Sequence, residues 1–139
     1  MVAFAAAAPG AERQPQHDVV ASSHGRSVPA TLGTHCAPVN GGVRCADYRY
    51  PLRTKVRLPI HPRGRIVLNF RVKPQEIDAQ LRDRRSRSVY ELQTSGRGRE
   101  RTIRLPRELP RGWDRLGFFV RYSRGDADFE VDLKRHPHS

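Results

Sequence analysis

The sequence predicts an all-β fold, a single antiparallel β-sandwich that is immunoglobulin-like in its size and number of strands. Short segments in which apolar and polar residues alternate with a period of two follow one another along most of the chain. Each segment is apolar on one face only, which is typical of antiparallel sheets that cover a core on one side. A chain of 139 residues has room for one domain with a core of its own.

The chain divides into four segments. Residues 1–11 are an apolar run that ends in small residues and resembles the end of a secretory signal peptide, without a basic residue before it; a disordered Ala-rich tail is the alternative. Residues 12–34 are rich in Pro, Ser, Gly and Gln, and we expect a flexible leader there. Residues 35–135 are the expected sandwich domain and residues 136–139 a tail. No stretch approaches the roughly 18 apolar residues of a membrane span.

Two cysteines, Cys36 and Cys45, lie symmetrically about the pair Asn40-Gly41. Asn-Gly is the strongest short signal for a hairpin, since a type I′ turn needs a positive φ at both central residues. Such a turn places the cysteines opposite each other at a site without ladder hydrogen bonds, where Cα atoms approach to ~4.5 Å and a disulfide can form. We therefore predict a cross-strand disulfide, an oxidising compartment, and a protein that is secreted or resides in the cell envelope.

The other strands are expected over residues 43–48, 53–60, 65–73, 88–94, 101–105, 115–122 and 127–134. Residues 75–83 are ambiguous, because Ile77 and Leu81 share a face in a strand and also in a helix, which Pro74 can begin. A strand is favoured there, because every clearer segment is a strand. The immunoglobulin pattern of a Trp between two distant cysteines is missing, so a disulfide between the sheets is excluded.

The last two strands form the best-determined pair in the sequence. A turn at residues 123–126 pairs Val120 with Phe129 and Phe118 with Val131, each apolar side chain opposite another. A shift by one residue would turn every apolar side chain of the strand into water, so the facing is well specified.

The formal charge of +12 comes mostly from arginine, which outnumbers lysine by 23 to 3. The composition of a GC-rich genome and a surface selected for an anionic partner both explain this excess. Guanidinium groups bind phosphates and carboxylates through charge-assisted, often bidentate hydrogen bonds. Seven arginines flank the expected strand at residues 88–94, and we expect them at one edge or end of the sandwich: Arg82, Arg84, Arg85, Arg87, Arg97, Arg99 and Arg101. Only Tyr90 lies near enough to stack on a base, so the cluster predicts binding of polyanions without sequence specificity.

No catalytic constellation is recognisable in the sequence. A Gly-x-Ser-x-Gly motif is absent, and Asp128, Glu130 and Asp132 alternate as they do on a solvated strand face. A metal site of His35 with the two cysteines is disfavoured, because structural zinc sites draw their ligands from two close-spaced pairs. Residues 124–126 are Arg-Gly-Asp, a tripeptide known from cell adhesion, but Gly-Asp is also common in turns.

These observations predict an exported, non-catalytic module of the envelope or the extracellular space, with no cofactor and no metal. Its partner is not specified by the sequence; a cell-envelope protein is one class. The alternative function is binding of anionic polymers, such as acidic glycans, phosphate polymers or nucleic acid, through the arginine cluster. Trp113 is expected to close one end of the sandwich, with stacking on carbohydrate as its alternative role.

Overall fold

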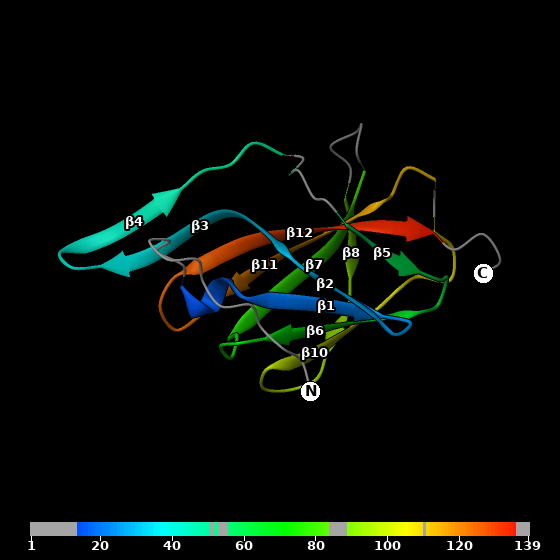
Figure 1. The fold of residues 1–139 in the computed structure, drawn as a ribbon, viewed down its shortest axis with the longest axis horizontal. Coiled ribbons are helices and arrows are strands. Elements are labelled where there is room, and N and C mark those ends of the chain that lie inside the picture. The colour runs from blue at the N-terminus through cyan, green and yellow to red at the C-terminus, as the bar shows by residue number, and fades with distance from the viewer. Residues whose placement is uncertain (1–13, 51, 53–55, 84–88, 110, 136–139) are drawn as a thin grey trace.

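The computed structural model describes residues 14–50, 52, 56–83, 89–109 and 111–135. They form two β-sheets packed against each other around one core, so the predicted β-sandwich is confirmed (Figure 1). A single turn of 3₁₀ helix, Pro15–His17, precedes the first strand. The immunoglobulin-like topology stays a prediction.

The first sheet has five antiparallel strands in the order β2-β1-β6-β10-β9. Their bounds are β1 Val19–Ser23, β2 Arg26–Pro29, β6 Arg65–Phe70, β9 Thr94–Ser95 and β10 Glu100–Arg104. In β6, Ile66, Leu68 and Phe70 are buried, while the residues between them point to the outer face. The alternation in the sequence therefore sets which face of this sheet covers the core.

The second sheet has the order β4-β3-β12-β11-β7-β8, and β5 pairs with β12 as well. The bounds are β3 Thr31–Val39, β4 Gly42–Ala46, β5 Arg57–Ile60, β7 Glu76–Arg82, β8 Val89–Leu92, β11 Arg115–Arg121 and β12 Asp126–Arg135. β3 pairs antiparallel with the first part of β12, and β5 pairs parallel with its last part. The ambiguous segment at residues 75–83 is thus a strand, as favoured.

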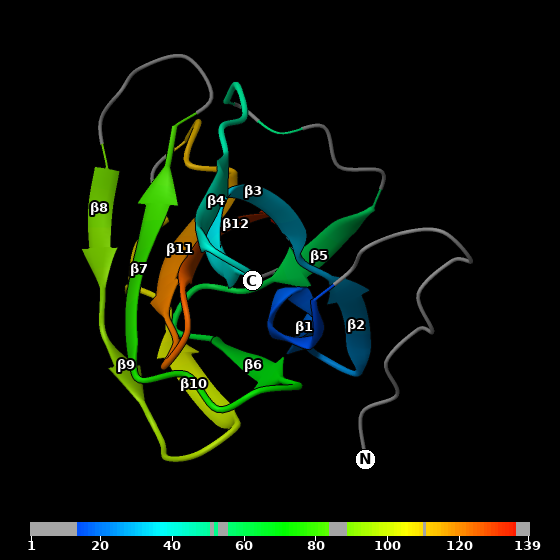
Figure 2. The same ribbon diagram turned by 90° about the vertical axis from the view of Figure 1, so that its left-hand side faces the viewer.

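Three phenylalanines join the two sheets. Phe118 of β11 and Phe129 of β12 stack with ring centroids 5.0 Å apart, and Phe118 meets Phe70 of the other sheet edge to face at 6.3 Å. Figure 2 shows β8 and β9 following each other down one side of the molecule, with β8 in the second sheet and β9 in the first. The chain therefore closes that side of the sandwich by changing sheets.

The flexible leader expected at residues 12–34 is wrong for residues 19–34. These residues form β1, β2 and the beginning of β3, and Val19, Ala21 and Ser23 are buried in alternation. His24 and Gly25 join β1 to β2 with φ of 48° and 74°, the positive values that a type I′ turn needs at both central residues. Several buried positions have small side chains, so the segment has the composition of a linker although it alternates as a strand does.

The cysteine hairpin has the predicted register, with Cys36 opposite Cys45 and Val39 opposite Gly42. The disulfide is formed, and the two Cα atoms are 4.0 Å apart. The predicted type I′ turn is wrong, because Gly41 has a φ of 87° and Asn40 does not have a positive φ. Figure 1 shows that this hairpin extends beyond the rest of the sandwich.

The last hairpin has the predicted facing but not the predicted register. Phe118 lies opposite Phe129 and Leu116 opposite Val131, two residues away from the expected pairs. The loop is closed by a hydrogen bond from the Tyr122 N–H to the carbonyl of Gly125. Gly125 has a φ of 94°, and a Cβ there would collide with the carbonyl oxygen of Cys36 in the neighbouring strand. The turn therefore forms around Gly125, and a shift of two residues keeps every apolar side chain inside.

Tyr90 and Trp113 lie near one end of the sandwich. Trp113 is half-buried and packs against the core, as expected for a residue that closes an end. Tyr90 is 47% exposed, and its strand β8 is the edge strand of the second sheet. The two rings meet edge to face at 6.3 Å.

Candidate functional site

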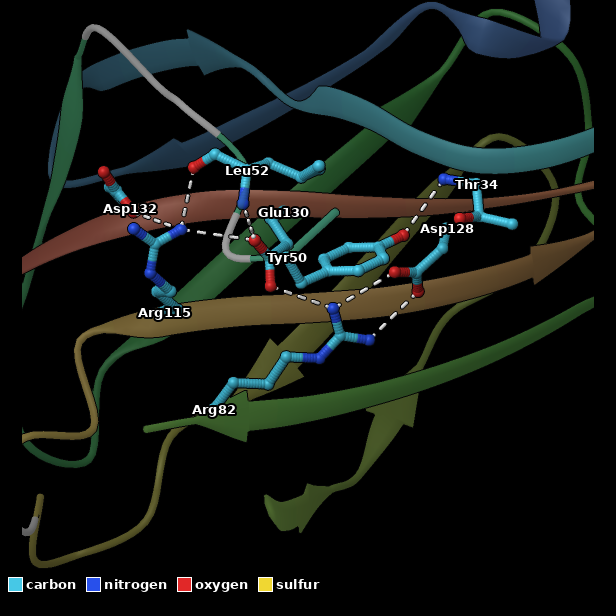
Figure 3. A network of polar contacts seen from close by, with 8 residues as sticks. All are labelled: Thr34, Tyr50, Leu52, Arg82, Arg115, Asp128, Glu130 and Asp132. Carbon is cyan, nitrogen blue, oxygen red and sulfur yellow. Dashed lines mark hydrogen bonds and ion pairs between the residues drawn. The ribbon is translucent and has the colours of Figure 1, made fainter. Parts of the chain in front are cut away.

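A network of charged side chains lies on the outer face of the second sheet (Figure 3). β12 alternates between core residues and acids, so Asp128, Glu130 and Asp132 share its outer face. Tyr50 and Leu52, which come between β4 and β5 in the chain, lie over the acids. Sequence reasoning expected a solvated face here, but Glu130 is only 1% exposed and Asp132 only 8%.

Glu130 is the centre of the network. Its Oε1 accepts hydrogen bonds from the Leu52 N–H at 2.9 Å and from Nη1 of Arg115 at 3.2 Å, and its Oε2 accepts one from Arg82 at 3.0 Å. Arg115 also donates to the Leu52 carbonyl at 2.9 Å and lies 3.4 Å from Asp132. A buried carboxylate is tolerated when its oxygens are satisfied in this way.

Arg82 reaches the network from β7 across the intervening strand β11. Its two terminal nitrogens bind Asp128 in a bidentate pair at 3.0 and 3.1 Å. Gly117 of β11 lies under this path, and a Cβ there would collide with the guanidinium group. Burial alone would lower the pKa of Arg82, but Asp128 and Glu130 outweigh it and raise that pKa above its usual value.

Tyr50 covers the Arg82–Asp128 pair. The guanidinium carbon of Arg82 lies 5.5 Å from the ring centroid, within the range of a cation–π contact. The hydroxyl accepts a hydrogen bond from the Thr34 N–H at 3.0 Å, and the absence of a side chain at Gly33 leaves room for it. Burial, followed by a hydrogen bond to Asp128, raises the pKa of Tyr50.

This network fastens the segment around Tyr50 and Leu52 to the sheet. Its acids and arginines are hydrogen-bonded to one another or to backbone groups, and the segment lies over them. No three His, Cys, Asp or Glu side chains of the described residues are grouped to hold a metal ion. The arrangement is suited to stabilisation more than to ligand binding or proton transfer.

Among the four members of the predicted arginine cluster that the structure describes, Arg82 is separated from Arg97, Arg99 and Arg101. Arg82, at the end of β7, belongs to the buried network. Arg101 donates through Nε to the Gly98 carbonyl at 3.1 Å and through Nη2 to the carbonyl of Pro74, which precedes β7, at 3.4 Å. The two arginines therefore lie at opposite ends of β7. Arg97 and Arg99 are exposed in the β9–β10 hairpin, and Arg84, Arg85 and Arg87 lie outside the described residues.

Four other exposed arginines come together at one end of the first sheet, and we call them the arginine corner: Arg63, Arg65, Arg104 and Arg107. Arg65 of β6 lies directly opposite Arg104 of β10. The pairing continues beyond the strands, since the Leu105 N–H donates to the Gly64 carbonyl at 2.9 Å and the Arg63 N–H to the Pro106 carbonyl at 3.1 Å. Within the described part of the chain, none of the four has an acidic ion-pair partner.

Sequence reasoning missed this corner because its arginines come from two segments that are far apart in the chain. Both strands were expected, over residues 65–73 and 101–105, and each has an exposed arginine at one end. Their pairing was not expected, since local alternation does not say which strands are neighbours.

A pocket of about 310 Å³ lies beside Trp113, at the C-terminal ends of β5 and β12. It is lined by Ile60, Arg111, Gly112, Trp113, Asp114, Leu133 and Arg135. Its mixed lining does not define a ligand class.

No protein-family model matches the chain, and no curated protein or solved structure matches it. None of the described residues belongs to a helix long and apolar enough to cross a membrane. The class that the structure defines is a disulfide-bonded β-sandwich with a strongly basic composition.

Proposed function

We propose that the protein is an exported, non-catalytic module that binds anionic polymers through exposed guanidinium groups. The observation that carries this proposal is the division of charges within the fold. Several acids, including Asp18, Asp128 and Glu130, are buried or half-buried against arginines, whereas the arginine corner is exposed and unpaired among the described residues. With a net charge of +12, such a surface attracts polyanions.

Export is supported by the disulfide, because cystine bridges persist in oxidising compartments. Binding in place of catalysis is supported by the buried network. Its titratable groups hold one another and lie beneath Tyr50 and Leu52, and Glu130 and Asp132 are buried. The test of export is fractionation of the host cells. Recovery of the oxidised protein from medium or envelope supports it, and recovery of the reduced protein from the cytoplasm contradicts it.

The ligand class follows from the chemistry that is exposed. Guanidinium groups recognise phosphate and sulfate groups in planar, bidentate geometry. Stacking on bases needs several exposed aromatic rings in a row. The described surface has Tyr90 beside Trp113 in one place and Tyr48 and Tyr50 in another, and none of these rings belongs to the arginine corner. The backbone charges of a polymer, not its bases, are therefore the expected target.

The test is a salt titration with labelled long-chain polyphosphate, heparin and single-stranded DNA, with neutral dextran as the control polymer. We expect the logarithm of the affinity for the three polyanions to fall linearly with the logarithm of salt concentration, because binding releases condensed counterions. Dextran should not bind. Absence of polyanion binding at low salt, or binding that salt does not weaken, would refute the proposal.

A further inference from the structure

The arginine corner contains a pair of like charges held in register. Arg65 and Arg104 are direct partners of adjacent antiparallel strands, and both are exposed on the outer face of the first sheet. Opposed residues in such a pair have Cα atoms roughly 4.5–5.5 Å apart. Like charges in direct opposition destabilise a sheet. The fold therefore contains an unfavourable pair of like charges. Both positions are exposed, so a smaller polar residue would fit in place of either arginine.

The neighbouring turn holds a third arginine in an uncommon backbone conformation. Arg63 has a φ of 61°, a left-handed value that residues with a Cβ seldom adopt. The turn is closed by a hydrogen bond from the Gly64 N–H to the His61 carbonyl at 3.0 Å. It is tied to the chain after β10 through the Arg63 N–H, which places Arg63 beside Arg107. A left-handed residue with a Cβ costs free energy and persists where the surrounding structure holds it in place.

The described groups around the corner are mostly uncharged or basic. Glu91 is an exposed acid on the β8–β9 side, two residues before Gln93, whose carbonyl accepts a hydrogen bond from the Arg104 N–H at 3.4 Å. The β1–β2 turn lies against the corner, since the ring of His24 contacts that of His61 with centroids 3.9 Å apart. Farther along the outer face of the first sheet, Ser22 of β1 and Ser27 of β2 share a hydrogen bond of 2.7 Å. Thr102 lies on β10, on the other side of β6. Glu108, next to Arg107, is the exposed acid closest in the chain.

We propose that the arginine corner is a binding site for the phosphate groups of a linear phosphate polymer. Two adjacent guanidinium groups can each donate two hydrogen bonds to one tetrahedral anion, and the anion removes the repulsion between them. Arg63 and Arg107 extend the positive charge along the sheet end, so that successive phosphates of one chain are bound. This inference rests on the proposed polyanion binding and locates it at a defined site with a defined ligand class.

The experiment compares two double variants that lose the same charge from the same sheet. Arg65→Ser with Arg104→Ser changes the corner, and Arg97→Ser with Arg99→Ser changes the β9–β10 hairpin at the opposite end of β10. We expect the corner variant to bind long-chain polyphosphate at least about tenfold more weakly, with a salt slope smaller by about two. The hairpin variant should lose no more than about twofold. Orthophosphate, heparin and polyglutamate serve as competitors, and polyphosphate should displace the probe best.

Each outcome separates the corner from general polyanion binding. Equal losses in both variants, or a larger loss in the hairpin variant, would overturn the corner as the site and leave polyanion binding itself intact. Better competition by polyglutamate or heparin would overturn phosphate as the ligand class. Failure of the unaltered protein to bind any polyanion would refute the proposed function. Melting temperature supplies an independent readout, because both Arg65→Ser and Arg63→Gly should raise it while they weaken polyphosphate binding; a fall would contradict the stored repulsion and strain.

Discussion

At the scale of single residues, the buried carboxylate of Glu130 connects the polar network outside the core. It binds Arg82, Arg115 and the backbone of Leu52, groups that come from three separate parts of the chain. Removing one charge of a buried, paired network leaves its partners uncompensated and costs about 3–5 kcal/mol. We predict this loss in the unfolding free energy for Glu130→Gln, measured by urea denaturation.

The matched control is Glu76→Gln, which removes the carboxylate partner of Arg121 in an exposed pair. Solvent and salt screen exposed pairs, so the midpoint of unfolding should not change. Equal effects of the two substitutions would show that the Glu130 network is as solvated as the surface pair.

Tyr122 gives the fold a specific dependence on alkaline pH. It is 3% exposed, and its hydroxyl has no hydrogen-bond partner among the described residues. Burial, and to a smaller extent the charge of Asp18, raises the pKa of Tyr122. An unfolded tyrosine titrates near ~10, so above that pH the unfolded chain releases a proton that the native protein retains. Stability is therefore complete below pH ~10 and falls as the pH rises further, by up to ~1.4 kcal/mol per pH unit for one tyrosine.

We predict two effects of Tyr122→Phe on the unfolding free energy. Below pH ~10 the variant should be as stable as the parent or more stable by about 1 kcal/mol, because an unsatisfied buried hydroxyl is removed. At higher pH its stability should fall less steeply. Some slope should remain, since the pKa of Tyr50 is raised as well. Urea denaturation at a series of pH values measures both, and an unchanged slope would assign the alkaline loss to other groups.

At the scale of elements, the sequence predicts which face of a strand is buried better than it predicts how strands pair. Alternation identifies which side chains of β6, β11 and β12 are buried, because a period of two is a property of the strand alone. The register of the last hairpin depends on where Gly125 fits against Cys36, a contact between distant segments. Local patterning has no information about such a contact, so the facing is right and the register is wrong.

The same reasoning explains what was missed at the candidate sites. In the sequence Asp128, Glu130 and Asp132 have the pattern of a solvated row, because no periodicity indicates that Tyr50 and Leu52 cover them. Gly117 in β11 and Gly33 in β3 are available signals, since glycine inside a strand marks a close approach of another group, here Arg82 and Tyr50. The arginine corner depends on the β6–β10 pairing. The cysteine hairpin was predictable in register because all its determinants are within ten residues.

The disulfide should stabilise its own element moderately. Cys36 and Cys45 are nine residues apart, and closing a short loop limits the unfolded chain only modestly. We predict that the Cys36→Ser, Cys45→Ser double variant loses about 2–3 kcal/mol in unfolding free energy. Val43→Ser, at a position that is 69% exposed in the same hairpin, should lose nothing measurable. Thiol titration of the unreduced, unfolded parent should find no free thiol; two free thiols would contradict the bond.

At the scale of the whole molecule, two separate layers hold the sandwich together. The aromatic contacts of Phe70, Phe118 and Phe129 join the sheets from inside. The Glu130 network fastens the β4–β5 connection to the outside of the second sheet. At the arginine corner of the first sheet, by contrast, charged side chains are exposed in the part of the chain that the structure describes. The described outer faces of the two sheets thus differ in chemistry: on the second sheet acids and arginines neutralise one another, and on the first sheet the arginine corner has exposed arginines.

Phe118 is the residue that we expect to contribute most to the packing between the two sheets. It is fully buried and contacts an aromatic ring in each sheet. Phe118→Ala should cost about 3–5 kcal/mol, through lost burial and the cavity left behind. A small domain has only about 5–15 kcal/mol of stability, so the variant should melt far below the parent or fail to fold. Phe119→Ala is the matched control, since the next residue of β11 points outward and is 39% exposed. Calorimetry should find its melting temperature close to the parent's, and comparable losses at the two positions would mean that the facing of β11 is reversed.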